Sequence, residues 1–222
     1  MQLIPSYRVR KAPGPIVVDG RLQEENWQEA ERFELQKVLR QSGDEQPLRA
    51  RTHVAALWDE KNLYLAFEVE DDEIWATLRE HDARLFREEC VEFFIDPAGE
   101  GRQYIEAQVN SLNTVRDLLV DGTVIALGKA EYDAMARWHF KALRSAVEIR
   151  EGWGWTLEAA IPWPEFSFSK RSFPPQPGDE MRVNCYRYER SRTGAKPLEL
   201  SAWSEVANSF HEPERFGRFI LV

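Results

Sequence analysis

Acidic side chains are the most numerous reactive groups in the sequence, and Glu92 and Asp96 lie on one face of an extended segment, residues 90–96. Glycoside hydrolysis needs two carboxyl groups roughly 5–9.5 Å apart. Four residues of an extended strand separate Glu92 from Asp96 by ~13 Å, which is too far for such a pair. Glu88 and Glu89 are adjacent, so they point to opposite sides of an extended chain. The sequence therefore predicts no catalytic residues, and we expect the protein not to be an enzyme.

Metal-ligating residues are present but do not follow a metal-binding spacing. The chain has four histidines: His53, His81, His139 and His211. None of them forms a His-x-x-x-His motif, so only a zinc site assembled from distant segments is left open. Carboxylates in turns can supply oxygen ligands to calcium. We therefore expect no cofactor, with a structural calcium ion left open, for which the candidate ligands are Asp59, Asp71, Asp72, Asp82 and Asp96.

Composition excludes several classes of protein. The chain has 222 residues and a formal net charge of -9, whereas nucleic-acid-binding proteins usually carry a basic field. No stretch approaches the ~20 apolar residues of a membrane span. We therefore expect neither nucleic acid nor membrane as a partner. No signal peptide is visible, so we expect a cytoplasmic location unless an export signal has been removed.

The elements that must position these side chains are mostly strands, because alternating apolar and polar residues dominate the chain. One helical pattern covers residues 22–30, where Leu22, Trp27 and Ala30 share a side. Strands are expected over residues 16–19, 33–38, 51–58, 63–70, 91–96, 104–110, 114–120, 141–149, 156–161, 181–189, 198–203 and 216–222.

This pattern predicts an all-β fold, an antiparallel β-sandwich of the immunoglobulin-like or jelly-roll-like kind with one short N-terminal helix. No break in composition divides the chain, so we expect residues 1–222 to form a single domain. Cys90 and Cys185 both fall in apolar strands, which favours two buried free thiols over a disulfide bridge.

Short motifs in a fixed order give the sequence a family resemblance. Two of them are Val-Glu-Phe-Phe-Ile-Asp at residues 91–96 and Pro-Glu-Arg-Phe-Gly at residues 213–217, and it is the order and spacing of the whole set that makes it specific for a fold. The others lie at residues 18–20, 57–59, 63–65, 104–114, 158–163 and 182–184. Together they resemble the family 9 carbohydrate-binding modules and their relatives in the dopamine-monooxygenase-N-terminal-like sandwich group.

In sugar-binding members of that family, two aromatic side chains clamp a terminal sugar. The resemblance assigns these places to Phe86, six residues before Glu92, and to Phe210, three residues before Pro213. Both places are usually tryptophan in the family, so phenylalanine offers a smaller stacking surface here. Only one of two adjacent strand residues can reach the site. The polar contacts implied by the resemblance are Glu92, Asn110, Asn208, His211 and one of the pair Tyr186 and Arg187.

The resemblance implies a non-catalytic module that binds the end of a saccharide and works with a separate glycoside-active enzyme. Aromatic residues make up 12% of the chain, which suits a ligand whose apolar C–H faces lie flat on rings. Two alternatives are open at this point. One is a structural or interaction module without sugar affinity. The other is a haem-binding electron-transfer domain, which would need Met135 or Met181 together with a histidine.

Overall fold

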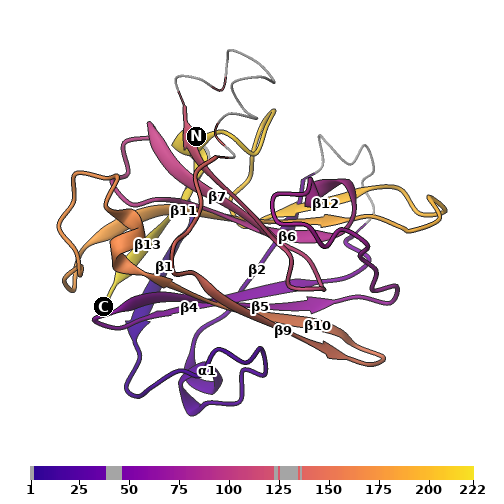
Figure 1. Ribbon diagram of the computed structural model, residues 1–222, viewed down its shortest axis with the longest axis horizontal. Helices are drawn as coiled ribbons and strands as arrows, with labels where there is room; N and C mark the ends of the chain where they lie inside the picture. The colour runs from indigo at the N-terminus through magenta and orange to yellow at the C-terminus, as the bar shows by residue number, and fades with distance from the viewer. Residues whose placement is uncertain (1–2, 39–46, 123–124, 126–134, 136) are drawn as a thin grey trace.

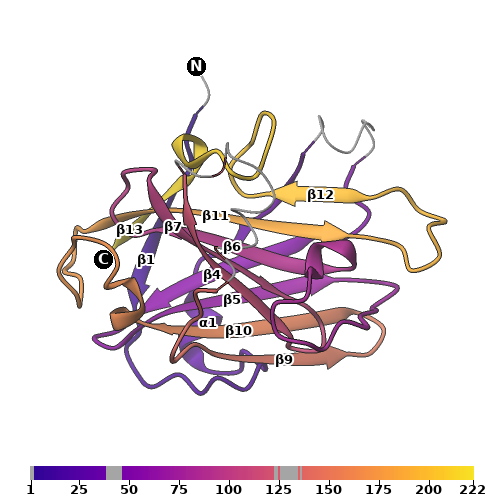
Figure 2. The same cartoon turned by 45° about the horizontal axis from the view of Figure 1, so that its top comes forward.

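The computed structural model describes residues 3–38, 47–122, 125, 135 and 137–222. Its strands lie in two facing layers, which Figures 1 and 2 show from two directions. The first layer has the order β8 (Val115–Asp121), β7 (Gln103–Val109), β6 (Cys90–Asp96), β11 (Glu180–Glu189) and β13 (Gly217–Leu221). The second has the order β4 (Thr52–Trp58), β5 (Asn62–Glu70), β10 (Gly154–Pro162) and β9 (Arg144–Arg150).

Shorter elements complete the layers. β12 (Glu199–Ala202) pairs with β11 and with β3 (Gln36–Lys37), and β2 (Phe33–Glu34) pairs with β4. The helical elements are α1 (Glu25–Glu29) and the single 3-10 turns η1 (Leu85–Arg87), η3 (Trp163–Phe166) and η4 (Pro213–Arg215). The predicted all-β sandwich with one short N-terminal helix is confirmed, and none of the helices in the described ranges is long and apolar enough to cross a membrane.

Strand β1 (Ser6–Lys11) joins the two layers and departs from the predicted antiparallel pattern. It runs parallel to β13, with Tyr7 opposite Phe219, and parallel to β4, with Arg10 opposite Leu57. The expectation of a strand at residues 16–19 was wrong, because these residues belong to no strand. Ile16 is apolar because it packs beside α1, whereas the alternation of Tyr7 and Val9 with arginines had marked the true first strand.

The alternation of side chains divides each strand between two environments. On β6, Val91 and Phe93 face the apolar interior between the layers, whereas Phe94 belongs to a second apolar cluster on the outer face of the first layer. Glu92 therefore lies on that outer face, as the sequence predicted. Cys90 and Cys185 are both free and buried, which confirms the expected thiols.

The N-terminal segment closes the outer face of the second layer. Trp27 of α1 is fully buried and donates its Nε1–H to Glu158 Oε1 at 2.8 Å. The backbone N–H groups of Asp19 and Gly20 donate to Glu158 Oε2 at 3.0 and 3.1 Å. Gly20 has a φ of 83°, and a Cβ there would lie 2.9 Å from the backbone of Glu148. Only glycine fits this approach of the turn to β9.

Candidate functional site

A pocket of about 410 Å³ opens on the outer face of the first layer, over β6, β7 and β11. Five of the residues predicted from the sequence line it: Phe86, Glu92, Asn208, Phe210 and His211. The other lining residues are Phe94, Glu106, Gln108, Tyr188 and Ser209. The structure therefore brings together segments that lie far apart in the sequence, namely η1, three strands and the loop before η4.

The two predicted aromatic side chains both lie beside Tyr188. The ring centroid of Phe86 lies 6.2 Å from that of Tyr188. The ring centroid of Phe210 lies 5.4 Å from that of Tyr188, in an edge-to-face arrangement. Phe86 is half-buried, whereas Phe210 is only 6% exposed. Because one face of Phe210 stacks on Tyr186, its opposite face and edge are what remain for a ligand.

A carboxylate organises the loop that carries Phe210. Glu212 accepts the backbone N–H groups of Ala207, Asn208 and Ser209 at 2.7, 2.8 and 3.3 Å. Burial works to raise the pKa of Glu212, but these hydrogen bonds outweigh it and hold the pKa below its ordinary value. The ionised side chain therefore fixes the loop in one shape.

A second carboxylate plays the same part for the segment that leads to Phe86. Glu88 accepts the N–H of Thr77 at 2.7 Å and that of Leu78 at 3.2 Å, and it also bonds the hydroxyl of Thr77. The loop from β5 to η1 is thereby folded back beside β6. Phe86 and Phe210 are thus each carried by a segment with its own anionic anchor.

The floor of the pocket holds two carboxyl groups. Glu92 is 2% exposed, and burial, reinforced by the charge of Glu106, raises its pKa well above the ordinary value against the opposing effect of Arg116. Within the described part of the chain, no group donates a hydrogen bond to the Glu92 side chain. Its hydrogen-bonding capacity is therefore directed to whatever enters the pocket.

Glu106 and Gln108 alternate on β7 with Ile105, Ala107 and Val109, which face the apolar interior, and both reach the same floor. Gln108 donates its Nε2–H to Glu106 Oε1 at 2.9 Å, and the Oε1 of Gln108 is buried without a hydrogen-bond partner. A buried unpaired acceptor beside an open pocket suits a ligand that brings its own donors. These polar groups can form hydrogen bonds with hydroxyl groups of a ligand, and the rings around them can stack against an apolar face of the same ligand.

His211 lies at the edge of this floor as a neutral ring. Its Nδ1 is 2.9 Å from the hydroxyl of Tyr104, and its Nε2 is 3.6 Å from Glu106 Oε2. Burial lowers the pKa of His211 to about 4, so the contact with Glu106 is not an ion pair at neutral pH. A neutral imidazole keeps one donor and one acceptor nitrogen.

Of the pair Tyr186 and Arg187, Tyr186 lies on the pocket side, as alternation requires. It is fully buried beneath Phe210, so it supports the pocket and does not line it. Arg187 points to the opposite side of β11, where it donates to the carbonyl of Glu70 at 2.7 Å. The structure therefore does not bring Arg187 to the pocket.

Arg187 belongs to a buried charge cluster, which comprises Asp71, Glu89, Arg187 and Glu189. Its Nη2 bonds Glu189 and lies 3.6 Å from Asp71 Oδ2. Burial raises the pKa of Glu89, and the charges of Glu189 and Asp71 raise it further, while Arg187 opposes them. The arginine therefore neutralises interior carboxylates instead of meeting a ligand.

Asn110 is also absent from the pocket. Its Nδ2 donates to the carbonyl of Leu78 at 2.9 Å, while its Oδ1 accepts the N–H groups of Leu112 and Thr114. All of these contacts shape the turn after β7 and tie it to the loop before η1. Asparagine is a common turn-forming residue, and this role accounts for the hydrogen bonds of the Asn110 side chain.

Glu106, Gln108 and Tyr188 line the pocket but were not predicted as site residues. A usable signal was present, because Glu106 and Gln108 repeat at the spacing of two residues that places side chains on one face. The missing information was the register, which sets Glu106 opposite Phe94 and Gln108 opposite Glu92. Only this pairing shows that β7 shares its outer face with Glu92.

The five aspartates considered for calcium lie in different surroundings. Asp59 and Asp96 accept backbone N–H groups of their own turns. Asp72 forms an ion pair with Lys196 at 2.8 Å, whereas Asp71 belongs to the buried charge cluster. Asp82 lies beside His81 and His139. Among the residues that the structure describes, no group of metal-ligating side chains contains two of these five. A structural calcium ion stays a prediction.

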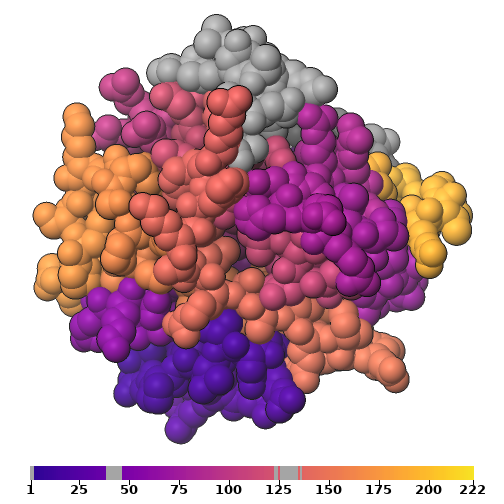
Figure 3. Space-filling model, viewed as in Figure 1, coloured from indigo at the N-terminus to yellow at the C-terminus, as the bar shows by residue number. Residues whose placement is uncertain are grey.

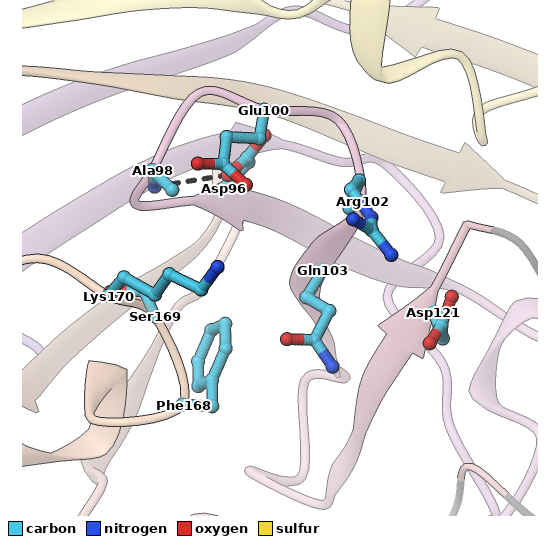
Figure 4. A pocket seen from close by; sticks show the side chains of 9 residues that line it. All are labelled: Asp96, Ala98, Glu100, Arg102, Gln103, Asp121, Phe168, Ser169 and Lys170. Atoms are coloured by element: carbon cyan, nitrogen blue, oxygen red, sulfur yellow. Dashed lines mark hydrogen bonds between the residues drawn. The ribbon is translucent and has the colours of Figure 1, made fainter.

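A second hollow, of about 210 Å³, lies at the other end of β6 and β7. Figure 4 shows the side chains around it, with one aromatic ring, Phe168, beside Lys170 on one segment and the charged groups of Glu100 and Arg102 on another. It lacks a pair of rings around a shared polar floor. The pocket over β6, β7 and β11 is therefore the better candidate for a ligand with both apolar faces and hydroxyls.

Comparison with known protein families places this geometry in context. Residues 18–222 match the family described as "Carbohydrate family 9 binding domain-like". The chain belongs to this family. The carbohydrate-binding module inferred from the sequence motifs is thereby confirmed, and a haem-binding domain is disfavoured. Met181, one of the two methionines which that alternative needed, is 2% exposed between the layers.

A curated relative is similar to this family 9 module over most of its length. Endo-1,4-beta-xylanase A of Thermotoga neapolitana is 26% identical over 215 residues, which are 94% of this chain and 17% of that protein. The chain thus spans about a sixth of the xylanase.

Two solved structures share the fold. A family 9 module of Caldicellulosiruptor kristjanssonii in complex with cellotriose has a TM-score of 0.69 at 15% identity, covering 97% of this chain and 93% of its own. A putative carbohydrate-binding protein of Bacteroides uniformis has a TM-score of 0.72 at 16% identity, covering 99% and 100%.

Proposed function

We propose that the pocket binds the end of a saccharide between the rings of Phe86 and Phe210 without changing it chemically. The observation that carries this proposal is that both rings line one pocket whose floor holds Glu92. Sugar rings present apolar C–H faces to aromatic side chains and hydroxyls to polar ones. The pocket offers both kinds of surface in one place.

Each side chain has a distinct part in this proposal. Phe86 and Phe210 receive the faces of the sugar, while Glu92 and Gln108 bond hydroxyls from the floor. Asn208 and His211 contact the rim of the ligand. Because a pocket of this size buries little area, we expect dissociation constants in the range of about 1 µM to 1 mM.

Calorimetric titration with a panel of glycans tests the proposal. Cellotriose heads the panel because the Caldicellulosiruptor module was solved with it, and xylo-oligosaccharides follow because of the xylanase relative. We expect Phe86→Ala and Phe210→Ala each to weaken binding by about tenfold or more. Phe168→Ala removes a half-buried ring from the second hollow and should leave binding unchanged.

Four results would contradict the proposal. Unchanged binding in both pocket variants would remove the clamp, and loss of binding in Phe168→Ala alone would move the ligand to the second hollow. Absence of binding to every glycan would favour a structural or interaction module. Release of shorter products during the titration would show that the two carboxyl groups of the floor perform chemistry.

We further propose that the module works with a glycoside-active enzyme that supplies the catalysis. Its support is the similarity to part of a xylanase that is about six times as long. A binding domain raises the local concentration of an enzyme on its polymer. Pull-down of the protein on insoluble xylan or cellulose, with Phe86→Ala as the control, tests whether it can hold a partner at a polysaccharide surface.

A further inference from the structure

Two histidines and two aspartates from three distant segments meet at one edge of the first layer, outside the saccharide pocket. His81 and Asp82 lie in the loop before η1, Asp117 is on β8, and His139 precedes β9. One ligand atom from each of the four lies within 4.8 Å of those of the other three. Figure 3 shows the loop before η1 and the segment before β9 on the same face of the molecule.

Three of the separations between these atoms are close to those of a tetrahedral coordination sphere, while His81 approaches Asp117 Oδ1 through its other nitrogen, Nε2, at 3.8 Å. Zn²⁺ binds histidine nitrogen and carboxylate oxygen at ~2.0–2.2 Å, which places neighbouring ligand atoms roughly 3.3 Å apart in a tetrahedron. His81 Nδ1 lies 3.2 Å from Asp82 Oδ2, and His139 Nδ1 lies 3.1 Å from Asp117 Oδ1. The cross-distance from His139 Nδ1 to Asp82 Oδ2 is 3.5 Å.

The carboxylate of Asp117 and the backbone of Asp82 are held in place by contacts of their own. Asp117 is 1% exposed, and its Oδ2 accepts the N–H of Phe140 at 2.9 Å, which leaves Oδ1 facing the histidines. Asp82 adopts a φ of 64°, and its carbonyl accepts a hydrogen bond from Arg116 at 2.6 Å. Such outer contacts orient metal ligands before the ion arrives.

The two imidazole side chains leave the site open to ions from solvent, and their nitrogen atoms determine which metal ions the site prefers. The side chains of His81 and His139 are 52% and 47% exposed, so an ion can reach the buried carboxylate between them. Their rings lie 5.1 Å apart in an edge-to-face arrangement. Imidazole ligands suit zinc and similar transition ions, whereas calcium and magnesium prefer oxygen alone.

The other two histidines of the chain are differently placed. His53 Nε2 lies 3.9 Å from one carboxylate, that of Glu34, and His211 is in the saccharide pocket. A histidine beside a single exposed carboxylate is an ordinary surface pair. We propose that His81, Asp82, Asp117 and His139 together bind one Zn²⁺ ion.

Titration of the metal-free full chain with zinc chloride, followed by calorimetry, tests this site. We expect one equivalent to bind, with affinity lowered by about 100-fold or more in His139→Ala and in His81→Ala. His53→Ala is the matched control and should bind as the unaltered chain does. Co²⁺ in place of Zn²⁺ should give the visible absorption of a tetrahedral ion, and that absorption should disappear in His139→Ala.

Several results would overturn the site. They are the absence of stoichiometric zinc binding, an equal loss of affinity in His53→Ala, or displacement of zinc by calcium at a similar concentration. Because both histidines are about half exposed, their replacement should not unfold the chain, and circular dichroism of each variant checks this. A folded His139→Ala variant with unchanged zinc affinity would show that the four residues form only ion pairs.

Discussion

The ring of Phe210 stacks on the ring of Tyr186 with 4.0 Å between centroids and 13° between planes, and the Tyr186 hydroxyl donates to the Phe210 carbonyl at 2.9 Å. One buried residue of β11 thus fixes both the side chain and the backbone of a pocket residue. The Tyr186 hydroxyl also accepts a hydrogen bond from Asn184 at 2.9 Å. The aromatic wall of the pocket therefore depends on a side chain that no ligand needs to touch.

Replacing Tyr186 by phenylalanine should lower the free energy of unfolding by about 1–3 kcal/mol, because the buried carbonyl of Phe210 would lose its partner. Chemical denaturation measures the change. Tyr188→Phe is the control, since its hydroxyl bonds no group in the described part of the chain. An equal loss of stability in both variants would show that the tether to Phe210 contributes nothing particular.

Glu92 should make saccharide affinity depend on pH. Its pKa is raised above the ordinary value by burial and by Glu106. Hydroxyls that donate to it favour the ionised form, so binding lowers its pKa. Affinity should therefore rise as the pH increases from the ordinary glutamate value of ~4.3 towards the raised pKa.

Calorimetry over a series of pH values measures this slope, and Glu92→Gln should make the affinity nearly independent of pH. His211 does not contribute above neutral pH, because its pKa is lowered to about 4. A slope that persists in Glu92→Gln would assign the pH dependence to another group, such as Glu106.

Removal of the loop anchor Glu212 should weaken saccharide binding without unfolding the protein. In Glu212→Ala the three backbone N–H groups before Phe210 lose their common acceptor, so we expect affinity to fall by about tenfold. Glu212→Gln keeps one acceptor oxygen and should recover part of the loss. The exposed neighbour Glu214 provides the control, because Glu214→Ala should leave the titration unchanged.

Glu89 should make the protein less stable as the pH rises. Burial raises its pKa in the folded state, so the folded chain holds a proton that the unfolded chain releases above the ordinary value of ~4.3. The contribution is fully present below that value and is lost as the pH rises towards the raised pKa. In Glu89→Gln the midpoint of thermal unfolding should fall less steeply between neutral and alkaline pH, and an unchanged slope would exclude this residue as the cause.

The local pattern of the chain was sufficient to predict most of the strands and the orientation of Glu92. Val91 and Phe93 alternate with Glu92 and Phe94, and this alternation fixes which side chains face the interior. The same rule correctly allowed only one of Tyr186 and Arg187 on the pocket side. Pattern alone failed for Ile16, whose burial under α1 resembles that of a strand residue.

The remaining site residues could not be predicted because they depend on contacts between distant segments. Glu106 reaches the pocket through the register of β7 with β6, and no feature of its own neighbourhood reveals that pairing. Asn110 shows the converse, since its family position suggested a ligand contact while its hydrogen bonds serve a turn. His81 and His139 share no motif, and only the fold places their rings 5.1 Å apart.

The position of β1 has a consequence for how this chain reaches its native state. Its neighbours are β13 and β4, so one edge of β1 stays unpaired until β13, which is remote from it in the sequence, has folded against it. Pairings between such remote segments close late and slow the search for the native topology. During synthesis on the ribosome, the seam between the layers stays open until β13 has emerged, and in that interval the uncovered edges of β11 and β1 are open to aggregation.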